Sequence, residues 1–106
     1  RLLVKDGEKE IFLSVEAIDW IEAAAYYSCL HANSRRYMLR ETIADLNEKL
    51  DPRKFVRIHR SAIVNLDRIR EIYREGQADG SVVLINGLKL KMSKAGRQRL
   101  IELGKG

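Results

Sequence analysis

The residues with the most chemical potential gather between positions 55 and 65, a run that reads Phe-Val-Arg-Ile-His-Arg-Ser-Ala-Ile-Val-Asn. Arg57, His59 and Arg60 stand directly ahead of Ser61–Leu66, which we expect to form a short helical turn. The start of a helix presents free N–H groups and a partial positive charge, so it favours anions. Basic side chains at a helix start are repelled by its partial positive charge, and a bound anion offsets this repulsion. This segment therefore predicts a phosphate-binding site.

A second segment, Ser-Lys-Ala-Gly-Arg, begins at Ser93 and repeats this arrangement. Ser93 is expected to cap a helix that runs to about Leu103, where Gly104 would end it. Lys94 and Arg97 then lie near the start of the helix, again against the dipole preference. Each segment alone is also compatible with an ordinary capped helix whose charged side chains extend into water. The presence of both segments in one small domain favours phosphate binding.

Adjacent tyrosines, Tyr26 and Tyr27, stand between expected strands and follow a run of alanines. Small residues let the backbone approach a partner closely, and tyrosines can pack on a sugar or donate a hydrogen bond to a phosphate. The alternative is the end of a β-hairpin with one of the tyrosines in the core. The sequence leaves both interpretations open.

Cys29 and His31 share one face of an expected strand, which raises the question of a metal site or a nucleophilic pair. Zinc needs three or four ligands, and His59 is the only other histidine. The glycines match no phosphate-loop or dinucleotide-binding spacing. We therefore expect a plain half-buried strand here, with no catalytic residue, no metal and no cofactor.

Charge is unevenly distributed along the chain. There are 20 Lys and Arg residues and 15 Asp and Glu residues, for a formal net charge of +5. Residues 1–25 carry three bases and six acids, whereas residues 53–70 carry six bases and one acid. Residues 89–99 carry five bases and no acid. Basic segments set against an acidic start indicate one face built for a polyanion, with an acidic protein surface as the alternative partner.

Length and composition describe one globular domain. The 106 residues are 45% apolar and 33% charged, which excludes a disordered tail. No apolar run approaches the roughly 20 residues of a membrane span. The single cysteine excludes a disulfide framework and fits a reducing, cytoplasmic compartment. The chain begins at Arg1 without Met, so we expect residues 1–106 to be one domain of a longer protein.

A mostly β framework must position these residues. Alternating patterns and turn signals predict strands over residues 2–5, 9–14, 18–24, 28–32, 35–40, 55–58, 69–73, 81–85 and 88–92. Thr42–Leu50 is the clearest helix, and Asp51-Pro52 ends it. Asn86-Gly87 predicts a tight hairpin turn that places Val83 opposite Leu90. The expected fold is mostly β and antiparallel, with one short internal helix and a C-terminal helix.

The run from residue 55 to residue 65 closely resembles the signature of the LytTR-type DNA-binding domain. Other segments that resemble the family are Ile18–Ala23, Leu39–Leu50 with Asp51-Pro52 after it, and Met92–Lys94. The resemblance extends from about Ile11 to Leu103. It implies an elongated stack of small antiparallel sheets that forms the output domain of bacterial regulators, usually response regulators. It also implies a receiver or sensory domain in the parent chain, and double-stranded DNA with repeated half-sites that pairs of domains bind.

The resemblance also implies which residues contact DNA, through loops that enter successive major grooves. Arg60 and its neighbour His59 are candidates for a base contact, and arginine reads guanine through a bidentate pair of hydrogen bonds. Further base-reading positions fall at Ser28 and at the start of the last helix, where the candidates are Lys94 and Arg97. The expected phosphate and sugar contacts come from Tyr26, Tyr27, Arg57, Ser61 and Lys91.

The sequence thus predicts sequence-specific binding of double-stranded DNA by a bacterial transcriptional regulator. The alternative is a regulatory module that binds a protein or a ligand through its basic face. Single-stranded RNA is less favoured, because it requires exposed aromatic stacking platforms and only Tyr26, Tyr27 and Tyr37 are available.

Overall fold

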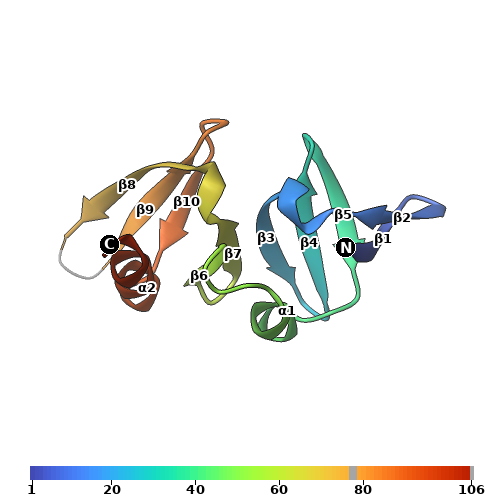
Figure 1. The fold of residues 1–106 in the computed structure, drawn as a ribbon, viewed down its shortest axis with the longest axis horizontal. Helices are drawn as coiled ribbons and strands as arrows, with labels where there is room; N and C mark the ends of the chain where they lie inside the picture. The colour runs from blue at the N-terminus through green and yellow to red at the C-terminus, as the bar shows by residue number, and fades with distance from the viewer. Residues whose placement is uncertain (77–78, 106) are drawn as a thin grey trace.

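The computed structural model describes residues 1–76 and 79–105, and within them the chain forms ten strands, two α-helices and two short 3-10 helices (Figure 1). The strands of the first half are β1 (Leu2–Asp6), β2 (Lys9–Leu13), β3 (Ile18–Ala24), β4 (Tyr27–Ala32) and β5 (Arg35–Leu39). The later strands are β6 (Phe55–His59), β7 (Ala62–Asn65), β8 (Ile69–Glu75), β9 (Asp79–Leu84) and β10 (Lys89–Met92). The helices are η1 (Val15–Ala17), α1 (Ile43–Lys49), η2 (Leu66–Arg68) and α2 (Lys94–Gly104).

The strands pair antiparallel into two sheets that follow each other along the long axis of the molecule (Figure 1). The larger sheet has seven strands in the order β2-β1-β5-β4-β3-β7-β6, and the smaller sheet has three in the order β10-β9-β8. The molecule measures 45 × 25 × 24 Å, so it is elongated. The prediction of a mostly β fold with one short internal helix and a C-terminal helix is confirmed.

Two clusters of buried apolar side chains hold these layers together. The first cluster lies between the larger sheet and α1, where Ile21, Leu30 and Leu46 are fully buried. The second cluster joins β6 and β7 to the smaller sheet and α2, and it includes Val56, Ile58, Val64, Val82, Met92 and Leu100. Burying one such side chain completely stabilises a fold by about 1.5–3 kcal/mol. Because β6 and β7 take part in both clusters, they fix the position of one sheet relative to the other.

Both α-helices lie where the sequence predicts them. The Thr42 hydroxyl oxygen accepts a hydrogen bond from Asp45 N at 3.2 Å, so Thr42 caps α1. α1 buries Ile43 and Leu46 against the larger sheet, and α2 begins directly after Ser93. Among the described residues, no helix has the length and apolar character needed to cross a bilayer.

The predicted helical turn at Ser61–Leu66 is wrong, because Ala62–Asn65 forms strand β7 between β3 and β6. All of β7 is buried, since the first cluster covers one face of the strand and the second cluster covers the other. A strand covered on both faces reads as a continuous apolar run, which periodicity alone does not distinguish from a helix. The helical turn follows as η2, where the Asn65 side chain accepts a hydrogen bond from Asp67 N at 2.9 Å.

The β9–β10 hairpin differs from the predicted register by one residue. Leu90 lies opposite Val82, whereas a two-residue turn predicted Val83 as its partner. The loop is longer than predicted because Ile85 N donates to the Arg68 carbonyl at 2.8 Å instead of pairing within the hairpin. Ile85 therefore belongs to the loop, where it is 59% exposed.

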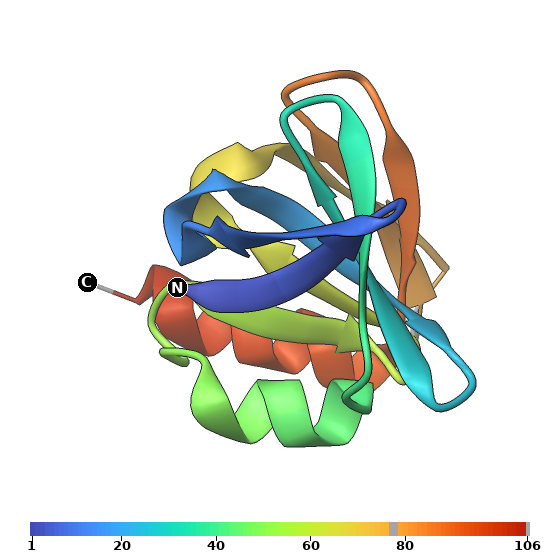
Figure 2. The same ribbon diagram turned by 90° about the vertical axis from the view of Figure 1, so that its right-hand side faces the viewer.

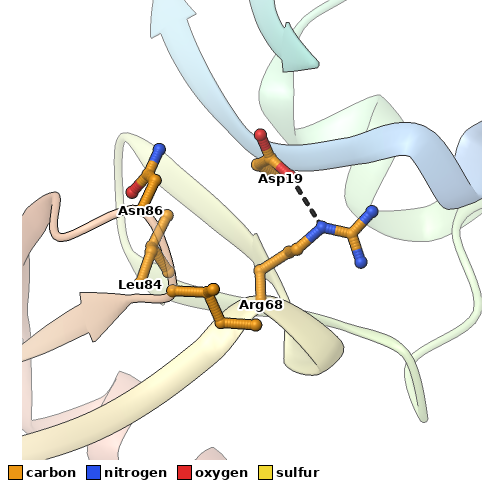
Figure 3. Close-up of a pocket in the computed structure, with 5 residues that line it drawn as sticks. Asp19, Arg68, Leu84 and Asn86 are labelled. Atoms are coloured by element: carbon orange, nitrogen blue, oxygen red, sulfur yellow. Dashed lines mark hydrogen bonds and ion pairs between the residues drawn. The ribbon is translucent and has the colours of Figure 1, made fainter. Parts of the chain in front are cut away.

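An ion pair joins η2 to the start of β3, across the junction of the two sheets (Figure 3). Arg68 Nε donates to Asp19 Oδ1 at 2.7 Å, and Arg68 Nη2 donates to the Glu16 carbonyl at 3.0 Å. Leu84 and Asn86 line the same small pocket, which has a volume of about 210 Å³. The side chains of Arg68 and Asp19 are 33% and 24% exposed, so water screens their attraction in part.

A double-mutant cycle with Asp19→Asn and Arg68→Gln should give a coupling free energy of about 0.5–1 kcal/mol at low salt. The coupling should fall at about 1 M salt, where the screening length is about 3 Å. Urea unfolding of the natural chain, the two single variants and the double variant measures this coupling. A coupling of zero at low salt would show that the ion pair does not stabilise the junction.

Candidate nucleic-acid interface

Three connections from distant parts of the sequence meet along one edge of the molecule. Figure 2 shows the tips of the β3–β4 and β6–β7 hairpins at the lower right beside the start of α2, whereas the β4–β5 and β9–β10 tips point upward. Backbone hydrogen bonds join them, from Ala23 N to the Ser61 carbonyl at 2.9 Å and from Ser93 N to the Ile58 carbonyl at 2.8 Å. We call the three connecting segments the loop edge: Ala25–Tyr26, Arg60–Ser61 and Ser93–Ala95.

The β3–β4 hairpin turns through Ala25 and Tyr26, and Ala25 adopts a left-handed conformation with φ of 58°. Tyr26 is 81% exposed at the tip and Tyr27 is 37% exposed, so both phenol groups can reach a partner. Ser28 is fully buried, and its hydroxyl donates to the Glu41 carbonyl at 2.8 Å. The expectation that Ser28 reads a base is therefore withdrawn, because its side chain points into the fold and is already bonded there.

The β6–β7 turn presents Arg60 to solvent. Arg57 Nη2 donates to the Arg60 carbonyl at 2.6 Å, and Arg57 Nε is buried with no hydrogen-bond partner among the described residues. His59 Nδ1 lies 2.9 Å from Ser61 Oγ and accepts from Ser61 N at 3.3 Å. The contact with Ser61 N assigns the imidazole proton to Nε2, the nitrogen that remains for an external partner. Arg57 and Ser61 thus shape the turn that carries Arg60 at its exposed tip.

α2 begins against β6 at very close range. Ser93 Oγ accepts from Gly96 N at 3.0 Å and donates to the Ile58 carbonyl at 3.2 Å. Further along the helix, Arg99 Nη1 donates to the Arg57 carbonyl at 2.8 Å. A Cβ atom on Gly96 would lie 2.6 Å from Ile58 Cα and closer still to its carbonyl group. Glycine at position 96 therefore lets the helix start touch the β6 backbone, and the predicted Ser93 cap is confirmed.

The start of α2 and the β6–β7 turn enclose a shallow basic pocket of about 390 Å³. The residues that line it are Arg57, His59, Arg60, Ser93, Ala95 and Arg99. Next to the pocket along the chain, Lys94 is exposed and Arg97 is half-buried. Arg99 is missing from the predicted site residues, although its spacing of four from Ala95 places both on one helix face.

Lys91 comes before the Ser93–Ala95 segment in the chain and lies outside the loop edge, on the outer face of the smaller sheet. It is exposed and lies opposite Ser81, on the side away from the second cluster. It lines an open depression that also contains Glu75, and Glu75 forms an ion pair with Lys89 at 3.2 Å. The hydrogen bond and positive charge of Lys89 hold the pKa of Glu75 below its usual value. Lys91 is thus a solvated cation outside the basic pocket.

The structure brings a third group with metal-binding chemistry to Cys29 and His31. Glu22 lies directly opposite Cys29 in the β3–β4 pair, and Glu22 Oε1 lies 3.0 Å from His31 Nε2. The sulfur, nitrogen and oxygen atoms of the three side chains all lie within 4.8 Å of one another. Burial raises the pKa of the Cys29 thiol, and the nearby Arg36 guanidinium opposes that shift. Sequence reasoning misses Glu22 because strand register, which one strand does not reveal, decides its neighbours.

A family model and two curated proteins match most of this chain. The family model of the LytTr DNA-binding domain matches residues 8–105. The chain is 32% identical over 81 residues to the CO-responsive transcriptional regulator RcoM of Rhodospirillum rubrum, a match that covers 76% of this chain and 34% of that protein. It is 31% identical over 99 residues to an uncharacterized response regulatory protein of Vibrio cholerae, a match that covers 89% of this chain and 37% of that protein.

A solved LytTr DNA-binding domain from Bacillus cereus has the same fold. The TM-score is 0.88 at 20% sequence identity, and the match covers 99% of this chain and 96% of that one. The chain spans about a third of the length of the curated relatives it matches. The family is one of non-enzymatic DNA-binding domains, in agreement with the sequence-based expectation. Because the family model covers nearly the whole chain, the chain belongs to the LytTr DNA-binding domain family of transcriptional regulators.

Proposed function

We propose that this domain binds double-stranded DNA with sequence specificity, and that the loop edge is the surface that contacts the DNA. The observation that carries this proposal is the basic pocket, where three arginines from β6, its turn and α2 converge. Phosphate contacts from such groups supply affinity, and side chains that reach base edges supply specificity. Hydrogen bonds between the loops hold the contacting groups at a constant spacing.

The shape of the domain supports contact with neighbouring grooves. Its long dimension is 45 Å, which exceeds one turn of B-DNA at about 34 Å. The loop edge runs along the middle part of this dimension, from the β3–β4 hairpin to the start of α2, and β1–β2 and β8 lie beyond its two ends (Figure 1). We infer that the outer members of the loop edge enter successive major grooves, with phosphate contacts between them.

The exposure and the hydrogen bonds of each candidate residue indicate which part of the DNA it contacts. Arg60 is assigned to a base contact, because it is exposed at the tip of a turn that Arg57 and Ser61 hold in place. Lys94 is favoured over the half-buried Arg97 as the base-reading residue of α2. His59 can donate through Nε2 to the same groove. The residues assigned to phosphate and sugar are Tyr26, Tyr27, Arg57, Ser61 and Lys91.

We further propose that pairs of these domains bind repeated half-sites on DNA, and that the parent protein contains a receiver or sensory domain. The support is the membership in the family and the relatives, which include a response regulatory protein and of whose length the matches cover only 34% and 37%. The runner-up function is a regulatory module that binds an acidic protein or a ligand through the same basic face.

Selection of the domain against a random pool of duplexes tests the proposal. The expected result is an enriched motif with two spaced half-sites that binds far more tightly than random DNA. Competition between the enriched duplex and random duplexes, followed by fluorescence anisotropy, measures the preference. Equal, weak binding to every duplex would mean that the domain has a basic surface without sequence specificity. That result would favour an acidic protein as the partner.

The affinity for the selected duplex should fall steeply with salt. About five to seven phosphate contacts predict a slope of roughly −4 to −6 for the logarithm of the association constant against the logarithm of the salt concentration. Anisotropy titrations at several salt concentrations measure this slope. A slope near zero would contradict an interface built on the basic pocket.

A further inference from the structure

Glu22, Cys29 and His31 converge on the face of the larger sheet that points away from α1. Cys29 and His31 alternate along β4, so both point to the same face, and Glu22 lies directly across from Cys29 on β3. The residues next to them, Ile21 and Leu30, face α1 instead. Because hydrogen-bonded strands hold the cluster, its geometry does not depend on a flexible loop.

The distances suit a tetrahedral ion. Zinc binds sulfur at about 2.3 Å and nitrogen or oxygen at about 2.0–2.2 Å, which places neighbouring ligand atoms about 3.3–3.7 Å apart. The separation of 3.0 Å between Glu22 Oε1 and His31 Nε2 is close to that range. The ligand atoms of the cluster lie within 4.8 Å of one another, so a shift of roughly 1 Å brings Cys29 Sγ into the same range.

Neighbouring side chains orient the cluster and leave one side open. The Trp20 indole stacks on the His31 imidazole, with ring centroids 4.2 Å apart and 7° between the ring planes. Cys29 is 4% exposed, whereas the Glu22 side chain is 47% exposed. The Glu22 side is therefore the side from which solvent reaches the cluster.

Arg36 is the cation that faces the cluster from β5, where it lies directly across from His31. It is exposed, so its guanidinium can turn into water when a metal ion binds. The Glu22 carboxylate and the Cys29 thiolate together supply two negative charges to a divalent ion. The charge balance around the cluster is thus compatible with a bound dication.

We propose that Glu22, Cys29 and His31 form a binding site for zinc or a divalent ion of similar chemistry, with water as the fourth ligand. Thiolate and imidazole are ligands that zinc prefers, and one carboxylate completes a three-residue set with an open position. On binding, the Cys29 thiol releases its proton to solvent, and the proton on His31 Nε2 also leaves to solvent while Nδ1 carries the proton of the neutral ring. The metal then takes the place of the hydrogen bond between Glu22 and His31. The site lies on the strands that lead to the Tyr26 tip, and it is independent of the proposed DNA contacts.

Titration of the reduced, chelator-treated chain with cobalt(II) tests the site. Cobalt(II) is the probe because thiolate coordination produces a charge-transfer band and tetrahedral geometry produces intense visible bands. We expect both bands to saturate at one equivalent and to disappear when zinc displaces the cobalt. Zinc should also raise the melting temperature of the natural chain.

Substitutions distinguish metal binding at this cluster from nonspecific binding elsewhere on the protein surface. Cys29→Ser should abolish the charge-transfer band and the zinc-induced rise in melting temperature. His31→Gln and Glu22→Gln should each lower the cobalt affinity at least about tenfold. The matched control is Glu48→Gln, an exposed carboxylate on α1 at the opposite face of the sheet, which should leave the spectrum and the affinity unchanged.

The proposal is overturned if cobalt binds without a charge-transfer band, or if Cys29→Ser binds it as tightly as the natural chain does. Absence of saturable binding would overturn it equally. Glu22 and His31 are partly exposed, so their variants carry the test even if the substitution at the buried Cys29 prevents folding.

Discussion

Replacing Gly96 with alanine is expected to lower the free energy of unfolding by about 1–3 kcal/mol and to weaken binding to every duplex. The new Cβ atom would overlap the Ile58 carbonyl group, so the start of α2 must move away from β6. Ser93 Oγ then loses its hydrogen bond to the same carbonyl, and Lys94 moves relative to Arg60. Urea unfolding measures the first effect, and anisotropy titration with selected and random duplexes measures the second.

Gly104→Ala is the matched control, because Gly104 is the last residue of the same helix. A Cβ atom on Gly104 meets no atom within 4 Å, and alanine in a helix is up to about 1 kcal/mol more favourable than glycine. This variant should therefore be as stable as the natural domain or slightly more stable, with unchanged DNA affinity. If Gly96→Ala behaved in the same way, the contact between α2 and β6 would not position the loop edge.

At the start of α2, the features that follow from local chemistry are predictable from the sequence. Ser93 caps α2 because a serine ahead of a helical pattern supplies the missing acceptor for the first N–H groups. The contact of Gly96 with Ile58 joins segments that are far apart in the chain, and a helical glycine has no local signature that identifies such a contact. The sequence therefore predicts where α2 begins but not what it touches.

The residues proposed to bind phosphate at positions 57–60 do not lie at the helix start that the sequence indicates. The predicted helix start at Ser61 is a β-turn, so no helix dipole attracts an anion there. The fold instead brings Arg57, Arg60 and Arg99 to one pocket, and their charges are the basis on which we propose phosphate contacts there. The prediction of phosphate binding at these residues does not depend on the helical turn, because charge acts through space whichever element carries it.

Strand register explains what the sequence could not show about β4. Alternation along β4 places Cys29 and His31 on one face, as predicted, and Ser28 on the other, where α1 and the chain ahead of it cover the sheet. Glu22 joins the cluster only because β3 pairs with β4 in one particular register. A shift by one residue would turn Glu22 to the opposite face, and no single strand carries that information.

Arg60→Ala is expected to lose about 1–3 kcal/mol of binding free energy on the selected duplex and to relax discrimination at one base pair. The side chain is exposed at the tip of the β6–β7 turn, and only its backbone carbonyl takes part in the hydrogen bond from Arg57. Truncation at Cβ therefore removes the guanidinium and leaves the turn intact. Anisotropy titration against the selected duplex and its single-base-pair variants measures both effects.

Loss of positive charge must be separated from loss of base reading. Lys91→Ala removes a cation that lies on the outer face of the smaller sheet, so it should weaken all sequences alike and reduce the salt slope by about 1. Arg53→Ala removes an 85% exposed arginine at the end of β6 away from the turn and should change the affinity little. If Arg60→Ala and Lys91→Ala gave the same sequence profile, Arg60 would contact phosphate rather than a base. The specificity would then have to come from Lys94, whose exposed position at the start of α2 makes it the next residue to test by the same titration.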